Sequence, residues 1–153
     1  MGPSNTMIIR EFQFEDADMV IELWKQCGLL RPWNHPVLDI KRKQTRDRDL
    51  FLVGVESEKI VASVMGGYEG HRGWINYLAV DLSMRKKGFG RMILEEVERR
   101  LKEKGAPKIN LQVRRDNTDV IEFYKSVGYE IDEVISLGKR LIQDPPWSPP
   151  GKF

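Results

Sequence analysis

The stretch that decides the fold is Trp74-Ile-Asn-Tyr-Leu-Ala-Val-Asp-Leu-Ser-Met-Arg-Lys-Lys-Gly-Phe-Gly-Arg91. Its first half is rich in aromatic and β-branched residues and contains no glycine or proline, which predicts a β-strand. Directly after it, Ile93, Leu94, Val97 and Leu101 recur at the spacing of one helical face. The sequence therefore predicts a strand that enters a long helix through a basic, glycine-containing loop.

The glycines of this loop lie where the predicted helix has backbone N–H groups without intrahelical partners. Because glycine has no Cβ, the backbone can approach a ligand closely at such a position. The free N–H groups and the positive end of the helix dipole favour a phosphate group. Basic residues surround the same turn, namely Arg85, Lys86, Lys87 and Arg91. The loop is therefore interpreted as a cradle for a diphosphate.

Two glycines alone are a weak signal, and the alternative is a tight strand-to-helix turn that binds no ligand. The loop lacks the spacing of a P-loop and the longer dinucleotide fingerprint, which argues against a nucleotide-binding domain. The context strengthens the ligand interpretation. Three strands precede the loop, basic residues surround it, and Asn117 begins a second helix after the next predicted strand.

Composition limits the class of protein. A chain of 153 residues suits a single domain, and its net charge of +2 includes no long basic block, which argues against nucleic-acid binding. No apolar run approaches the ~20 residues of a membrane helix. The lone Cys27 indicates a reducing compartment, so a cytoplasmic protein is expected. His35 and His71 are too isolated to form a metal site, and no metal is expected.

Three segments divide the chain. Residues 1–6 are polar and are expected to be a disordered N-terminus or a cloning remnant. Residues 7–142 are expected to form one domain. Residues 143–153 contain four prolines and are expected to form an extended tail, either disordered or packed locally.

The predicted fold class is α/β, with a mixed sheet and helices on both faces. Besides the long helix, elements are expected as strands at residues 8–13, 50–55, 60–65, 74–80, 108–113 and within 129–137, and as helices at residues 15–27, 36–45 and 117–127. Short turns make the middle strands an antiparallel meander, and the long helix makes a β-α-β crossover to a parallel strand. Gly66 and Gly67 are expected to end or bulge their strand. The charge-rich residues 39–49 are interpreted as a solvated surface.

Two motifs in order resemble the GNAT superfamily of acetyl-coenzyme A-dependent N-acetyltransferases. The first is Leu78-Ala-Val-Asp followed by Arg85-Lys-Lys-Gly-Phe-Gly90, and the second is Asn117-x-x-x-Ile-x-Phe-Tyr-Lys-x-x-Gly-Tyr129. The resemblance extends from about Ile8 to Leu137. Residues 29–34, 65–68 and 136–140 also resemble the YpeA-like bacterial subgroup. The resemblance implies transfer of the acetyl group of acetyl-CoA to a primary amine by direct attack.

The resemblance implies a set of coenzyme-binding residues. The central strand would pair with the pantetheine arm, and the loop would hold the diphosphate. The residues are Leu78, Ala79, Val80, Arg85, Lys86, Lys87, Gly88, Phe89, Gly90, Arg91, Asn117 and Tyr124. For Asn117 the simpler role is a helix N-cap, which is compatible with a coenzyme contact.

The resemblance implies that Tyr124 protonates the departing thiolate, because a nearby phenol can stabilise or protonate such an anion. The alternative is a core residue beside Phe123. The amine must also lose a proton, and Glu69 is the leading candidate for the base, with His71 behind it. For both, a turn residue is the alternative, and solvent is a further proton acceptor. Relatives that act on protein N-termini carry a glutamate where this chain has Gln112, which argues against that substrate class.

The resemblance also places the acceptor pocket against the first two helices and the loop between them. Arg31, Trp33, Asn34 and Tyr68 would line it, although Trp33 could simply cover the edge of the core. The acceptor is a small-molecule or peptide amine, and amino acids, polyamines, aminoglycoside-like compounds and protein lysines all remain open. An acyl-CoA-binding sensor or docking module with little turnover is the alternative function. Edge strands and the C-terminal region would allow a homodimer.

Overall fold

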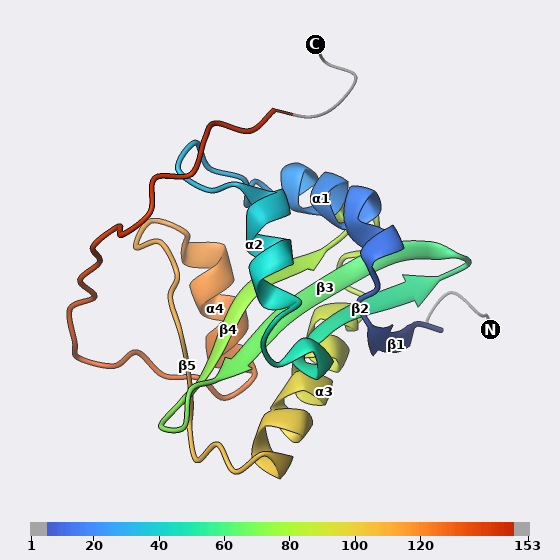
Figure 1. Ribbon diagram of the computed structural model, residues 1–153. Coiled ribbons are helices and arrows are strands. Elements are labelled where there is room, and N and C mark those ends of the chain that lie inside the picture. The colour runs from blue at the N-terminus through green and yellow to red at the C-terminus, as the bar shows by residue number, and fades with distance from the viewer. Residues whose placement is uncertain (1–5, 149–153) are drawn as a thin grey trace.

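The computed structural model describes residues 6–148, and a five-stranded mixed sheet runs through its centre (Figure 1). The strands are β1 (Ile8–Glu11), β2 (Phe51–Glu56), β3 (Lys59–Tyr68), β4 (Gly73–Val80) and β5 (Ile109–Leu111). They lie in the order β1-β2-β3-β4-β5. The β2–β3 and β3–β4 pairings are antiparallel and the β4–β5 pairing is parallel, as predicted for a meander followed by a crossover. The β1–β2 pairing is also antiparallel.

Four α-helices accompany the sheet. They are α1 (Ala17–Gln26), α2 (Pro36–Lys43), α3 (Phe89–Glu103) and α4 (Thr118–Ser126), with short 3₁₀ turns η2 (Phe14–Asp16), η3 (Arg48–Leu50) and η4 (Leu82–Met84). The helix α3 makes the crossover between β4 and β5. The predicted helices all exist, and α4 begins at an Asn117 N-cap whose side chain accepts a hydrogen bond from the N–H of Val120.

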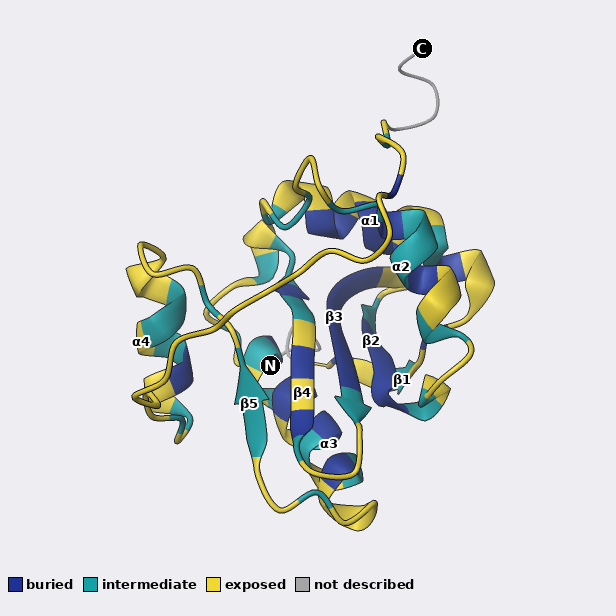
Figure 2. Cartoon of the chain, turned by 60° about the vertical axis from the view of Figure 1, so that its left-hand side comes forward, coloured by how far each residue is buried: buried dark blue, intermediate teal, exposed yellow. Residues whose placement is uncertain are grey.

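The core has two parts because the side chains of a strand alternate between the faces of the sheet. On β2, Leu52 packs in the part that contains α3, whereas Phe51 and Val53 pack in the part that contains α1 and α2. The four periodic apolar residues of α3 are buried as predicted. Figure 2 shows the resulting pattern, in which most of β3 is buried between the two helical layers.

The prediction for Gly66 and Gly67 was wrong. The strand β3 continues through both residues to Tyr68, and the register shift between β3 and β4 comes earlier, between Ser63 and Met65. A Cβ at position 66 would lie only 2.8 Å from Cγ2 of Val97. Glycine at position 66 therefore allows α3 to pack closely on the sheet.

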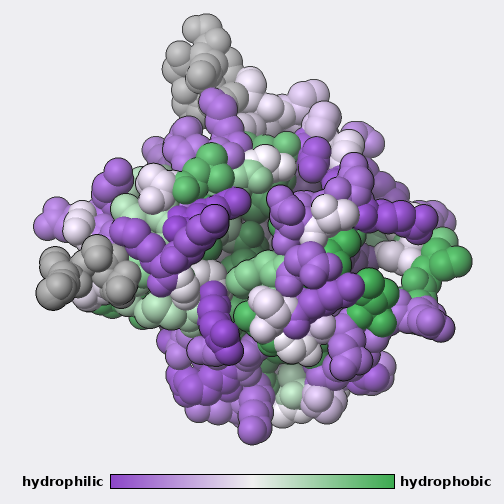
Figure 3. All heavy atoms as spheres, turned by 180° about the vertical axis from the view of Figure 1, so that it is seen from behind, coloured by the Kyte–Doolittle hydropathy of each residue, from purple (hydrophilic) through white to green (hydrophobic). Residues whose placement is uncertain are grey.

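The prediction of a last strand within residues 129–137 was also wrong. This segment contacts β5 and its flanks through side chains: Asp132 accepts hydrogen bonds from Lys108 and Asn110, and Ser136 bonds Gln112. The strand β5 is only three residues long, which gives a neighbour little backbone to pair with. The apolar side chains of the segment are consequently exposed, including Ile135 at 85%. Figure 3 shows the molecule from behind, where hydrophobic side chains form separate groups on a mostly hydrophilic surface.

Part of the proline-containing tail packs on the domain. The Asp144 carboxylate is buried and makes a bidentate ion pair with Arg42 of α2, at 3.0 and 2.6 Å. Trp147 packs against the core of α1 and α2. Within residues 143–148 the packing involves these two side chains, and the tail as a separate segment stays a prediction. The predictions for residues 1–5 and 149–153 lie outside the described residues.

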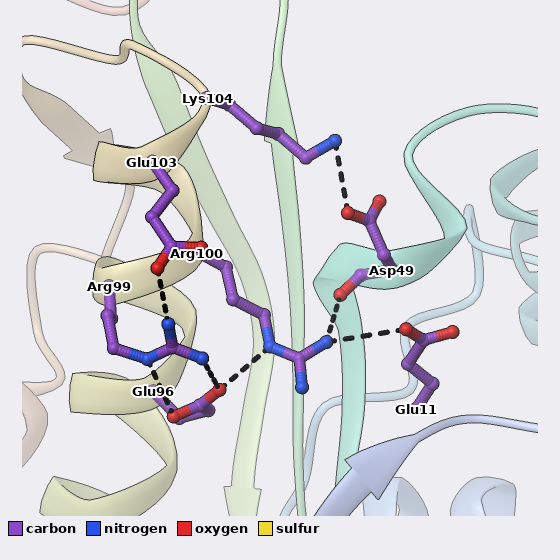
Figure 4. A network of polar contacts seen from close by, with 7 residues as sticks. All are labelled: Glu11, Asp49, Glu96, Arg99, Arg100, Glu103 and Lys104. Carbon is purple, nitrogen blue, oxygen red and sulfur yellow. Dashed lines mark hydrogen bonds and ion pairs between the residues drawn. The ribbon is translucent and has the colours of Figure 1, made fainter.

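A polar network fixes the C-terminal half of α3 to the edge of the sheet (Figure 4). The Arg100 guanidinium donates to the Asp49 carbonyl at 2.9 Å and pairs with Glu11 of β1 and with Glu96. Lys104 pairs with Asp49 at 3.1 Å. Arg100 is mostly buried, so its contacts hold α3 more firmly than the exposed pair between Arg99 and Glu103.

Candidate active site

The strands β4 and β5 pair over only part of their length. The ladder joins Gly73–Ile75 to Ile109–Leu111, and the remainder of β4, Asn76–Val80, has no pairing on this side. Tyr77, with φ of +54°, lies within the irregular part of the β3–β4 pairing. A cavity of about 790 Å³ opens here, lined by residues of β4, α2, α4 and the segment after β5. Unpaired backbone at a sheet edge is a ready partner for an extended ligand.

The loop after β4 leads to the N-terminus of α3. Gly88 is the N-cap residue with φ of +82°, a conformation that glycine adopts without strain. The first helical hydrogen bond runs from the N–H of Met92 to the Gly88 carbonyl, so the preceding N–H groups have no intrahelical acceptor. A Cβ on Gly90 would touch Phe123 and Val80 at 3.4 Å. The arrangement suits a phosphate-bearing ligand, because free donors, close backbone and basic side chains coincide.

The predicted coenzyme residues of β4 differ in exposure. Ala79 is buried, whereas Leu78 and Val80 are half-buried, and Leu78 lines the cavity. Phe89 is buried in the core below the loop. Arg85 donates from Nε to the Val80 carbonyl at 3.3 Å, which places this basic side chain beside the end of β4.

Tyr124 and Asn117 both line the cavity from α4 and its N-cap. The Tyr124 ring is buried and packs edge-on against Phe123 and Tyr129, with ring centroids 5.3 and 5.4 Å apart. Burial raises the pKa of the Tyr124 phenol, so the hydroxyl keeps its proton at neutral pH. The side chain can therefore act as a proton donor in the cavity.

Glu69 lies at the rim of the cavity, in the turn between β3 and β4. Its carboxylate accepts hydrogen bonds from the backbone N–H groups of Arg72, at 2.8 Å, and of His71. These bonds lower the pKa of the Glu69 carboxyl, which makes it a weaker base. Glu69 as the base stays a prediction, and the structure gives it a role in the turn.

The predicted acceptor residues are only partly brought together. Arg31, Asn34 and Tyr68 line the cavity. The Tyr68 hydroxyl, however, lies 3.3 and 3.2 Å from the carbonyls of Gly70 and Gly105 outside the cavity, and its single proton can be donated to either. Trp33 is exposed and does not border the cavity; the Arg114 guanidinium lies 5.0 Å from the centre of its ring. This cation–π contact joins the loop between α1 and α2 to the segment that follows β5.

One wall of the cavity was missed by sequence reasoning. The residues Asp39, Arg42, Lys43 and Arg46 all line it, from α2 and the turn after it. Their spacing of i, i+3, i+4 and i+7 is that of one helical face, and the buried Ile40 lies beside this face. The charge-rich region is therefore more than a solvated surface. The polar periodicity next to an apolar isoleucine was the signal that could have identified this wall.

A hydrogen-bonded cluster joins this wall to the irregular part of β4. The Tyr77 hydroxyl donates to Asp39 at 2.7 Å, and the Tyr77 ring stacks on Trp24 with centroids 3.8 Å apart. Trp24 Nε1 donates to the Ser63 hydroxyl, which in turn donates to the Tyr77 carbonyl, both at 2.9 Å. The backbone conformation of Tyr77 and the position of the Asp39 carboxylate are thus fixed together.

Comparisons with known proteins agree with this geometry. Residues 17–129 match the sequence model of the "Acetyltransferase (GNAT) family". Acetyltransferase YE1169 of Yersinia enterocolitica is 50% identical over 90% of this chain and 98% of its own length. The crystal structure of Ard1 from Thermoplasma volcanium has a TM-score of 0.75 at 25% identity, covering 82% of this chain and 84% of that one.

A further solved structure contains a coenzyme analogue. It is AAC(6')-Iy in complex with the bisubstrate analogue CoA-S-monomethyl-acetylneamine, with a TM-score of 0.73 at 18% identity, covering 88% of this chain and 99% of that one. At this identity the likeness concerns the fold alone. Sheet, loop and cavity together define a coenzyme A-dependent acyltransferase fold.

The chain belongs to the GNAT acetyltransferase family. It is an acetyl-CoA-dependent N-acetyltransferase that moves the acetyl group to an amine, as predicted, and its curated relatives are bacterial acetyltransferases of the YpeA-like kind. The sensor alternative is not favoured. Within residues 6–148 there is no helix both long and apolar enough to span a membrane, and no group of three or more residues that could bind a metal.

The Tyr77–Asp39 hydrogen bond allows a test of the cluster. Tyr77→Phe should lower the free energy of unfolding by about 1 kcal/mol, because the Asp39 carboxylate loses a part-buried donor. Urea denaturation measures the change. Tyr68→Phe is the matched control, because its hydroxyl bonds are longer and exposed, and it should cost clearly less. Equal costs for the two variants would contradict the role of Tyr77 in the cluster.

Proposed function

We propose that the unpaired part of β4 holds the pantetheine arm of acetyl-CoA and that Gly88–Arg91 holds the diphosphate. The observation that carries this proposal is the end of the β4–β5 ladder at Ile75 and Leu111, directly beside Tyr124 and the cavity. The bound coenzyme supplies the acetyl group as a thioester. The free N–H groups of the α3 N-terminus, with Lys86, Lys87 and Arg91, support binding of its phosphates.

We propose that Tyr124 protonates the departing thiolate. Tyr124 lines the cavity, and burial raises the pKa of its phenol further above neutral pH, so the hydroxyl has a proton to donate. Asn117 caps the same helix and lines the same cavity, which supports a coenzyme contact in addition to its capping role.

For the amine, we propose a subsite at Asp39 in addition to the predicted Glu69. Asp39 lines the cavity from α2 and is fixed by Tyr77, one residue before Leu78 on β4. Glu69 is engaged with its own turn. A carboxylate beside the reacting amine can bind the ammonium form and accept its proton, directly or through water.

The acceptor is proposed to be a small-molecule or peptide amine. The names of structural neighbours differ widely in acceptor, from an aminoglycoside acetyltransferase to a glucosamine-6-phosphate N-acetyltransferase, and do not choose between classes. Gln112, which bonds Ser136, offers no carboxylate of the kind that relatives acting on protein N-termini carry.

Acceptor-dependent release of free thiol from acetyl-CoA is the first test of this proposal. Amino acids, amino sugars, polyamines, aminoglycosides and a lysine peptide should be compared at equal concentration. With one class, thiol release should clearly exceed that of a blank without acceptor. The same blank corrects for the signal of the Cys27 thiol. If the enzyme binds coenzyme A in the same preparation but releases no more thiol than the blank with every class, the proposed acceptor range is wrong.

The role of Tyr124 predicts a split between turnover and binding. Tyr124→Phe should lower kcat by about 10²-fold or more, because the proton donor is lost while the ring remains. The Kd for coenzyme A, measured by calorimetry, should change less than about twofold. Tyr129→Phe is the control, because its hydroxyl bonds Glu98 away from the reacting groups, and it should leave kcat nearly unchanged. A similar kcat for Tyr124→Phe and the parent would remove Tyr124 from the reaction.

A homodimer is proposed as the state in solution. The strands β1 and β5 are the edges of the sheet, and Val134, Ile135 and Leu137 beside β5 are each more than three-quarters exposed. Multi-angle light scattering should give about twice the chain mass of 17.8 kDa. A mass of one chain across a range of concentrations would contradict it.

A cytoplasmic location also stays a proposal, supported by the unpaired Cys27.

A further inference from the structure

We propose that the acceptor amine carries an anionic group, a carboxylate or a phosphate, and that Lys43 and Arg46 bind it. This inference rests on the proposed function and adds the charge of the substrate to it. The cavity wall formed by α2 then has two poles, with Asp39 for the ammonium and the two cations for the anion. Amines with a second positive charge are disfavoured by the same wall.

The geometry of α2 separates the poles along one helical face. A helix rises about 1.5 Å per residue, so the backbone positions of Asp39 and Lys43 differ by about 6 Å along its axis. Arg46 lies in the turn beyond the end of α2 and extends the same wall. A substrate that meets both poles therefore has its anion several bonds away from its nitrogen.

The arginines that line the cavity differ in whether they are ion-paired. Arg42 is already engaged in a bidentate pair with Asp144 and also approaches Asp39 at 3.5 Å. By contrast, Arg46 has no carboxylate within ion-pair distance among residues 6–148, and the same holds for Arg31, which lines the cavity from the loop before α2. The cavity thus presents guanidinium groups that are available to a ligand.

Lys43 gives the second observation. Its ammonium lies at the cavity and donates to the Gly66 carbonyl, which leaves further N–H donors for a ligand. Burial lowers the pKa of Lys43, although Asp47 and Asp49 nearby act against the shift. Asp47 and Asp49 themselves approach Lys104. A bound anion would compensate the desolvation of the Lys43 ammonium.

The helix dipole alone does not account for this arrangement. Basic residues at the C-terminus of a helix are generally favourable, and Lys41 fits that explanation because it is exposed and outside the cavity lining. Lys43 and Arg46, in contrast, are turned to the cavity that contains Tyr77 and Leu78 of β4. Lys41 is therefore a matched control for both.

A charge series at constant chain length tests the proposal. Pentylamine, cadaverine, 5-aminopentanoate and 5-aminopentyl phosphate differ only at the end far from the reacting nitrogen. With acetyl-CoA, kcat/KM for at least one of the two anionic amines should exceed that of pentylamine about tenfold, and cadaverine should be the poorest. The better of the two anionic compounds identifies the carboxylate or the phosphate as the preferred group. Raising the ionic strength should reduce the preference, because salt screens charge recognition at an open cavity.

Variants then assign the preference to residues. In Lys43→Met with Arg46→Gln, the anionic-to-neutral ratio of kcat/KM should fall close to one, whereas Lys41→Gln should retain the parent ratio. Cadaverine equal to or better than both anionic amines would overturn the inference, as would an unchanged ratio in the double variant. Salt dependence of the parent enzyme provides the same test if the double variant does not fold. Equal kcat/KM values for charged and neutral amines would contradict this inference but not the proposed function. If the enzyme binds coenzyme A but acetylates no amine, both the inference and the proposed function are wrong.

Discussion

The separation of β4 from β5 is the constraint on which the rest of this structure depends. Two parallel strands that stayed paired would satisfy each other's backbone and leave no space between them. Here the pairing stops at Ile75 and Leu111, and the remainder of β4 turns its unpaired edge toward a cavity. Unpaired backbone N–H and C=O groups cost free energy, and a ligand bound in the cavity can supply the missing hydrogen bonds.

The separation is stabilised from the face of the sheet that carries α1 and α2. Tyr77 adopts a left-handed conformation that costs a non-glycine residue free energy. Trp24, Ser63 and Asp39 together hold its ring, its carbonyl and its hydroxyl. On the other face, α3 is fixed by its buried apolar stripe, by close packing at Gly66 and by Arg100. The free N-terminus of α3 is thereby held beside the end of β4.

The strand, loop and helices of the proposed coenzyme side could be predicted from sequence because their determinants are local. A strand, two glycines and a periodic helix follow one another in one stretch, and the Asn117 cap lies at the start of a second motif. The failures concern non-local packing. Glycine at position 66 is explained by Val97 on a distant helix, and the segment after Tyr129 lacks a strand because β5 is too short to pair with it. Neither neighbour is visible in the local pattern.

The proposed acceptor side could not be recognised from the sequence for a related reason. A charged face on a short helix is typical of a solvated surface. In α2 the buried Pro36 and Ile40 fix the orientation of the helix, and its charged face borders the cavity. The two ends of the cavity are therefore built differently. The proposed coenzyme end consists of backbone groups and glycines, which a sequence cannot vary freely without losing the turn. The proposed acceptor end consists of side chains of α2, which can change identity while the helix and its buried contacts remain. A fold arranged in this way can keep one acetyl donor while its acceptor differs between relatives.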